Sequence, residues 1–232
     1  MTRLIPFTFI ISLTVVVLVG IIISYQGYQY LPTLPKTATL LYSESFDDKN
    51  ALSRFRQGTP DLGHTTGTKE KAAWRVEGGR LFAEKAHNAP LWFKEKLPSG
   101  DLRISFQAQA HTNEGDLKCE VFGDGQNHQS GYVFINGGWK NTIRAIARQD
   151  EHGEDRHDDH RCQKTPAKRC VEPMKDQTWV IERRDGILYW YIDGVFTLKL
   201  ADNYPIKGLY FGFNNWSAAT SFDELRIHQL SP

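Results

Sequence analysis

The stretch DLRISFQAQAH, residues 101–111, decides the fold class. Apolar side chains occupy every second position from Leu102 to Ala110, and polar side chains occupy the positions between them. A period of two residues places the two sets on opposite faces of an extended strand. The stretch therefore predicts a strand with one buried face.

Similar stretches recur through most of the chain. In DLKCEVFGDG, residues 116–125, every second side chain is again apolar, and the stretch ends in a glycine turn. The Asp-Gly pairs at 185–186 and 193–194 are typical of tight hairpins. Apart from the first 30 residues, no long segment has the 3.6-residue period of an amphipathic helix. We therefore expect an all-β sandwich or barrel.

The N-terminus differs from the rest of the chain. Residues 4–24, LIPFTFIISLTVVVLVGIIIS, contain no charged side chain, and about 20 apolar residues span a bilayer as a helix. Tyrosines follow, without a small-residue cleavage site. Residues 1–30 are therefore predicted to be a cytoplasmic N-terminus and a signal-anchor transmembrane helix, and a cleaved signal peptide is the alternative. Residues 31–42, with two prolines, are predicted to be a stiff linker.

Charge and cysteine content bear on location and partners. Arg3 is the only charge before the apolar span, which favours an extracytoplasmic C-terminal domain, periplasmic or on the cell surface. The net charge of +1 does not favour nucleic acid as a partner. In an exported domain we expect Cys162 and Cys170 to form a disulfide around a polar loop, with Cys119 buried as a thiol. Three free thiols are the alternative.

Four stretches together carry a resemblance to a known family. They are ESFDD (44–48), WRVEGGRLF (74–82), LYWYIDG (188–194) and FGFNNWSAATSFDELRIHQL (211–230). Residues 43–232 resemble the concanavalin A-like lectin/glucanase superfamily, especially bacterial laminin-G-like domains. The resemblance implies a two-sheet antiparallel jelly-roll sandwich whose concave face often holds a ligand. Members include lectins, hydrolases, lyases and structural domains, so the resemblance does not fix an activity.

The catalytic motif of the similar glucanases is not met. Those enzymes use E-x-D-x-E on one strand, and two of the carboxylates flank the bond to be broken. The nearest match here is Asp116-x-Lys118-x-Glu120, in which lysine takes the central position. An ion cluster on a strand face is the favoured interpretation. No G-x-S-x-G, H-E-x-x-H or phosphate-binding loop is present, so no catalytic residue and no cofactor is expected.

The run RQDEHGEDRHDDH, residues 148–160, is the weak candidate for a metal site. Carboxylates at close spacing suit calcium, and their mixture with histidine suits zinc. The run lacks the spacing of a known calcium loop and also contains arginines, so a charged surface loop is favoured over a metal site. The weak candidate ligands are Asp150, Glu151, Asp155 and Asp158.

Residues 131–148 are predicted to form two strands joined at the turn NGGW. We expect Val133 and Ile135 to face the core, with Tyr132, Phe134 and Asn136 facing outward. Polar and aromatic residues here and on neighbouring strands combine donors for sugar hydroxyls with an aromatic face. The candidate ligand-binding residues are Arg103, Gln107, His111, Glu120, Tyr132, Trp139, Asn141, Arg144 and Arg148. The alternative is the ordinary solvated face of an antiparallel sheet.

The sequence therefore predicts a membrane-anchored extracytoplasmic jelly roll that binds a glycan or another cell-envelope ligand without catalysis. One alternative is a carbohydrate-active enzyme, a glycoside hydrolase or polysaccharide lyase, that uses the concave face. A second is a structural or protein-interaction domain.

Overall fold

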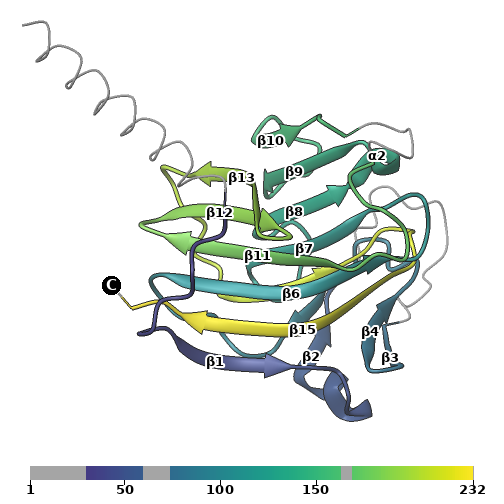
Figure 1. Cartoon of the computed structure of the whole chain (residues 1–232), viewed down its shortest axis with the longest axis horizontal. Helices are drawn as coiled ribbons and strands as arrows, with labels where there is room; N and C mark the ends of the chain where they lie inside the picture. Colours follow the sequence, from purple (N-terminus) through teal and green to yellow (C-terminus); the bar gives the residue numbers. More distant parts are fainter. Residues whose placement is uncertain (1–29, 60–73, 163–168, 232) are drawn as a thin grey trace, which may run out of the picture.

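The computed structural model describes residues 30–59, 74–162 and 169–231. They form two antiparallel sheets packed face to face (Figure 1). The eight-stranded sheet has the order β13-β12-β11-β6-β15-β4-β3, with β1 also paired to β15. Its strands are β1 (Thr39–Glu44), β3 (Arg75–Glu77), β4 (Arg80–Ala83), β6 (Leu102–Ala110), β11 (Gln177–Arg184), β12 (Ile187–Ile192), β13 (Val195–Ala201) and β15 (Thr220–Gln229).

The seven-stranded sheet has the order β10-β9-β8-β7-β14-β5-β2. Its strands are β2 (Phe55–Gln57), β5 (Leu91–Phe93), β7 (Leu117–Gly123), β8 (Tyr132–Gly137), β9 (Ile143–Arg148), β10 (Arg156–Asp159) and β14 (Tyr210–Asn214). A 3₁₀ turn, η1 (Lys49–Arg54), precedes β2, and the short turn α2 (Gly138–Asn141) joins β8 to β9. The expected all-β sandwich is confirmed.

The core between the sheets is dominated by aromatic rings. Trp179 and Trp190 lie with ring centroids 4.7 Å apart, and Phe213 stacks on Phe222 at 4.5 Å. Phe106, on the strand that starts at residue 102, contacts rings from both sheets. Such rings bury a large apolar area each, so they hold the two layers together.

The hairpins explain the Asp-Gly pairs. Asp185 and Gly186, between β11 and β12, have φ angles of 49° and 77°, and Asp193 and Gly194, between β12 and β13, have 51° and 75°. Two consecutive positive φ angles define the type I′ turn, which matches the twist of the flanking strands. These pairs therefore set the register of β11, β12 and β13.

The orientation of β8 differs from the sequence expectation. Phe134 is buried in the core and contacts Trp190 at 5.6 Å. Val133 and Ile135 instead pair with Glu120 and Lys118 of β7 and form a separate small cluster on the outer face of the sheet. The expectation that they face the core was wrong because residues 132–135 are apolar throughout, so alternation alone could not fix the phase.

The segment before β1 lies across the outer face of the eight-stranded sheet (Figure 1). The Leu31 N–H donates to the Gly194 carbonyl, and Arg103 of β6 donates to the Pro32 carbonyl at 2.7 Å. Part of the predicted linker, residues 39–42, belongs to β1. In the described ranges no helix has the length and apolar character needed to cross a bilayer. The predicted transmembrane helix falls on residues 1–30, of which 1–29 lie outside the described residues.

Candidate functional site

A pocket of about 530 Å³ opens on the outer face of the seven-stranded sheet, where β7 begins and β8 ends. Lys118 of β7 and Ile135 of β8 contribute from the sheet, and Trp139 comes from the turn α2. Asn88 and Trp216 come from two loops that are joined by backbone hydrogen bonds, including Asn88 N–H to the Asn215 carbonyl. The pocket therefore combines two indole rings with polar groups, the usual composition of a small-ligand site.

Three side chains form a closed polar ring in the wall of the pocket. The Lys118 ammonium lies 2.8 Å from a Glu151 carboxylate oxygen and donates to the Asn88 side-chain carbonyl at 3.0 Å. The Asn88 amide in turn donates to the other Glu151 oxygen at 3.2 Å. The Lys118 and Glu151 side chains are only 3% and 7% exposed. A buried ion pair needs such additional hydrogen bonds, so the ring is a tightly constrained unit.

Two carboxyl groups of the pocket, Asp116 and Glu151, have pKa values that are shifted in opposite directions. Burial raises the pKa of Asp116 above its usual range, against the effect of the Lys118 ammonium and of a hydrogen bond from the Trp216 backbone N–H. Burial would also raise the pKa of Glu151, but Lys118 and the nearby His128 outweigh it and lower the value to about 2. Glu151 is therefore a carboxylate at neutral pH, matched by the Lys118 ammonium.

The turn that carries Trp139 has an uncommon backbone. Trp139, Lys140 and Asn141 all have left-handed φ angles, of 50°, 63° and 65°, and the Thr142 N–H closes the turn on the Gly138 carbonyl. Each left-handed residue other than glycine costs roughly 1–2 kcal/mol. Such strain persists only where surrounding contacts over-determine it.

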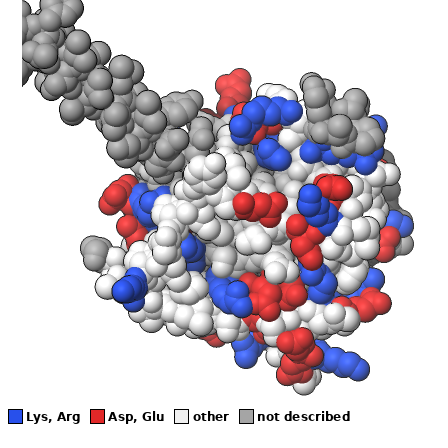
Figure 2. All heavy atoms as spheres, viewed as in Figure 1, with Lys and Arg blue, Asp and Glu red and all other residues white. Residues whose placement is uncertain are grey.

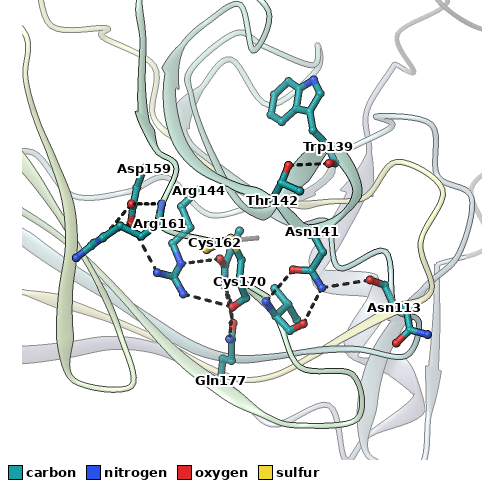
Figure 3. The surroundings of a disulfide bond; sticks show 12 residues. Asn113, Trp139, Asn141, Thr142, Arg144, Asp159, Arg161, Cys162, Cys170 and Gln177 are labelled. Carbon is teal, nitrogen blue, oxygen red and sulfur yellow. Dashed lines mark hydrogen bonds and ion pairs between the residues drawn. A yellow bond between two sulfur atoms is a disulfide. The ribbon is translucent and has the colours of Figure 1, made fainter. Parts of the chain in front are cut away.

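Asn141 supplies those contacts on one side of the turn (Figure 3). Its side-chain N–H groups donate to the Val171 carbonyl at 2.7 Å and to the Asn113 carbonyl at 3.2 Å. Its side-chain carbonyl accepts a hydrogen bond from the Val171 N–H at 2.8 Å. Figure 3 shows Trp139 pointing away from this anchor. Asn141 therefore fixes the turn, and Trp139, two positions earlier, lines the pocket.

Two contacts hold the Trp139 ring itself. The guanidinium of Arg156 lies over the indole at 4.5 Å, an arrangement in which the positive charge is attracted to the ring face. The His152 ring meets the indole edge-on at 5.6 Å. Trp139 remains 37% exposed, so part of the ring is available to a ligand.

The predicted disulfide between Cys162 and Cys170 is present, and Cys119 is a buried free thiol as expected. The Cys170 carbonyl accepts hydrogen bonds from Gln177, Arg144 and Asn136 at 3.2, 3.4 and 3.5 Å (Figure 3). Val171, the anchor for the α2 turn, follows directly in the chain. The disulfide therefore lies next to the segment that positions the pocket turn.

Glu120 forms a second buried polar cluster further along β7. One of its oxygens accepts hydrogen bonds from His128 Nδ1–H at 2.6 Å and from the Asn214 amide at 2.9 Å. The other accepts from the Gln129 backbone N–H at 2.9 Å. The carboxylate is fully buried, so its acceptor positions are used within the protein.

The nine candidate ligand-binding residues do not share one surface. Arg103, Gln107 and His111 lie on β6 and beyond it, on the outer face of the eight-stranded sheet. Arg103 pairs with Glu182 there and is almost fully buried. Burial, with Arg80 nearby, lowers the pKa of His111. This group is separated from the pocket by the whole thickness of the sandwich.

Three other candidates lie on the inner side of the seven-stranded sheet, near the ends of β8 and β9. Arg148 and the Tyr132 hydroxyl both donate to Asp202, at 2.8 Å. Burial raises the pKa of Tyr132 to about 12. Arg144 donates to Asn136 at 2.9 Å. Of the nine, Trp139 lines the pocket, Asn141 anchors its turn, and Glu120 shares the outer face.

The weak metal candidates point in different directions. Glu151 belongs to the polar ring, Asp158 accepts two hydrogen bonds from Arg156, and Asp150 caps the His152 backbone N–H. Asp155 is exposed. Within the described ranges, no three His, Cys, Asp or Glu side chains gather as they would around a metal ion.

Sequence reasoning missed most of the pocket. Asn88 and Trp216 lie in loops that are distant along the chain. Lys118 was expected in an ion cluster on the strand face, in place of a catalytic carboxylate, and was not expected to line a pocket. A lysine that is buried in a strand needs a partner, because buried ammonium groups are almost always paired. The identity of that partner depends on how the loops fold.

Comparisons with known proteins agree on the fold. No family model matches the chain, and no curated sequence does. Solved structures do match over most of its length. The fold is the concanavalin A-like jelly-roll sandwich. A non-specific endo-β-1,3(4)-glucanase from family GH16 matches with a TM-score of 0.60 and 11% identity, over 87% of this chain and 98% of that one.

Two further solved structures are similar. The laminarinase catalytic domain from Thermotoga maritima has a TM-score of 0.55 and 15% identity, over 84% of this chain and 99% of that one. The carbohydrate binding module CBM66 from Bacillus subtilis has a TM-score of 0.50 and 12% identity, over 76% and 96%. At these identities the likeness establishes the architecture, which hosts both catalytic and binding proteins.

Proposed function

We propose that this domain binds a glycan in the pocket between Trp139 and Trp216, without cleaving it. The observation that carries the proposal is the pocket itself, in which two indole rings stand beside a ring of hydrogen-bonding side chains. Sugars present apolar C–H faces and hydroxyl edges, and this combination of groups suits both. The solved structures of the same fold include a carbohydrate binding module and glucanases.

Two residues of β7, Lys118 and Glu120, are unsuited to cleavage of a glycan. Hydrolysis with retention needs two carboxyl groups that flank the bond about 5–5.5 Å apart. Glu120 is fully buried, and both of its oxygens accept hydrogen bonds from protein groups. Lys118 stands between the other two positions of the incomplete motif and is held by Glu151. The strand therefore does not offer a free carboxylate pair to a substrate.

One observation favours the enzymatic alternative. Asp116 and Glu151 both line the pocket, and their pKa values are shifted in opposite directions. Pairs of this kind can divide the roles of acid and base. The alternative requires release of reducing ends or of unsaturated products from a glycan, and that activity should disappear in Asp116→Asn. An active wild-type protein with an inactive Asp116→Asn variant would replace the binding proposal.

The binding test uses the full chain on a glycan array, followed by titration calorimetry with the strongest array ligand. We expect Trp139→Ala to weaken binding by about tenfold, which is the loss of one aromatic contact of roughly 1.4 kcal/mol. Tyr204→Ala is the matched control, since Tyr204 is an 82% exposed aromatic side chain outside the pocket. Array binding that is absent, or that Trp139→Ala leaves unchanged, contradicts the proposal.

Extracytoplasmic location and membrane attachment through residues 1–30 are part of the same proposal. The Cys162–Cys170 disulfide supports an oxidising compartment, because such bonds persist outside the cytoplasm. Fractionation of cells, with alkaline extraction of membranes, tests both points. Recovery of the protein in a cytosolic fraction would contradict the location, and its release by alkali would contradict a spanning helix.

A further inference from the structure

We infer that the pocket accepts the end of a glycan chain and excludes internal segments of a polymer. The inference rests on the proposed function and goes beyond it by naming the part of the ligand that is bound. The geometry that carries it is the closure of the sheet face beside the pocket.

The outer face of β8 and β9 is buried. Val133, Ile135 and Ala147 lie on this face, yet each has an exposure of 1% or less. On an antiparallel sheet with one open face these positions would contact solvent. Something therefore covers the surface along which an extended polymer would otherwise lie.

The cover is the loop between β9 and β10, residues 149–155. Its first residue is tied to the start of β8 by a hydrogen bond from the Gln149 N–H to the carbonyl of Gly131, which directly precedes β8, at 2.9 Å. Two residues later, Glu151 reaches Lys118 on β7 at 2.8 Å. Since β8 lies between β9 and β7 in the sheet, the loop must cross the outer face of β8 to make that contact.

The same loop forms one wall of the pocket. Glu151 is held by Lys118 and Asn88, and His152 packs on Trp139. A glycan that continued past this wall would have to separate a buried ion pair and leave its members without partners, which is unfavourable. A chain end needs no such opening. The pocket therefore fits a terminal sugar, with the rest of the glycan leaving toward solvent.

A closed pocket and an open groove differ in how they treat a chain end, whichever sugar is bound. A groove binds the same disaccharide whether it is terminal or internal, whereas a closed pocket loses affinity when a further sugar is added to the bound end. The discrimination comes from steric exclusion and from an ion pair that stays buried, so it should hold across ligands of different linkage.

The test is an array in which every disaccharide is present both as a free terminus and capped by one additional sugar. We expect capping to weaken binding at least tenfold for the ligands that bind. Equal binding to free and capped forms overturns the inference and leaves the proposed function standing. An array without any bound glycan overturns the proposed function, and the inference with it.

A loop variant tests the cause of the closure. Glu151→Gln removes the charge that holds the loop to Lys118, and Glu154→Gln makes the same change at an exposed position of the loop. We expect Glu151→Gln to reduce the ratio of the affinities for free and capped glycans severalfold. Glu154→Gln should leave this ratio unchanged. If Glu151→Gln keeps the wild-type melting profile and the full preference for free over capped glycans, the loop is not the wall of the pocket that excludes the added sugar. Should Glu151→Gln fail to fold, replacement of residues 152–154 by Gly-Ser-Gly takes its place, with the same two outcomes.

Discussion

The substitution Asn141→Ala isolates the anchor of the pocket turn. The Asn141 side chain is 1% exposed and takes part in three hydrogen bonds, two with Val171 and one with the Asn113 carbonyl. Its removal leaves a buried backbone N–H and two carbonyls without their partners, at roughly 1–3 kcal/mol for each unsatisfied group in an enclosed site. Alanine also tolerates the φ angle of 65° less well than asparagine does.

We expect Asn141→Ala to lower the free energy of unfolding by about 4 kcal/mol, a large effect for one residue. Asn141→Gly loses the same hydrogen bonds but adopts the left-handed backbone without strain, so it should be about 1 kcal/mol less harmful. The difference between the two variants measures the strain separately from the hydrogen bonds. Lys140→Gly, at a φ of 63° on the exposed side of the same turn, is the control and should not destabilise the protein.

The assay is urea unfolding followed by tryptophan fluorescence and circular dichroism, with linear extrapolation to water. A loss below about 1 kcal/mol in Asn141→Ala would refute the anchor, because even one unsatisfied buried group costs that much. An Asn141→Gly variant no milder than Asn141→Ala would refute the strain. In both variants the indole N–H resonance of Trp139, assigned with Trp139→Phe, should shift in NMR spectra.

Other predictions concern stability. The pKa of Glu151 in the folded protein is about 2, against an ordinary value of 4.5. Its contribution to the free energy of unfolding is therefore present above pH 4.5 and is lost as the pH falls toward 2. Glu151→Gln should reduce this loss by on the order of 3 kcal/mol, measured by urea titrations at pH 7 and pH 2.5. Replacing Cys162 and Cys170 by serine opens a loop with a sequence separation of 8 and should cost about 2.5 kcal/mol, so equal stability of oxidised and reduced protein would contradict a role in folding. Gly123→Ala places a methyl group 2.2 Å from the fully buried Trp92 ring and should destabilise by about 1–3 kcal/mol; an unchanged unfolding midpoint would show that the ring can move.

The alternation in β6 predicted a real strand because its two faces differ in chemistry. Residues 102, 104, 106, 108 and 110 are buried in the core, and the polar residues between them face outward. In β8 the contrast is missing, because Tyr132, Val133, Phe134 and Ile135 are all apolar. The phase of that strand is set by its pairing with β7, where Lys118 and Glu120 face outward. Sequence periodicity thus predicts a strand well but fixes its faces only when polar residues mark one of them.

The site was harder to predict than the fold because its members meet only in the tertiary structure. Asn88 is 30 positions from Lys118 and 63 from Glu151, and no local pattern links them. The sequence did single out Trp139 and Asn141 together, but as two ligand contacts. The structure separates them, with Trp139 lining the pocket and Asn141 facing the opposite way into the anchor.

Charge on the surface also has an arrangement that composition alone does not reveal. On the face drawn in Figure 2, acidic and basic side chains are interspersed. Among the described residues, local ion pairs include Arg75 with Glu77 and Arg226 with Glu224. Exposed pairs of this kind add little to stability, typically below 1 kcal/mol, whereas the buried pair of Lys118 and Glu151 shapes the pocket.

The segment from residue 30 to β1 sets a practical limit on any fragment of this protein. The Pro32 carbonyl accepts a hydrogen bond from Arg103, which forms a buried ion pair with Glu182. Strand β1 pairs with β15 and so protects one edge of that strand. A recombinant fragment that starts at residue 43 would uncover that ion pair and expose the edge of β15 to other chains, which invites aggregation. A fragment that starts at residue 30 keeps both protected, so soluble expression should depend on these thirteen residues although they lie on the sheet opposite the pocket.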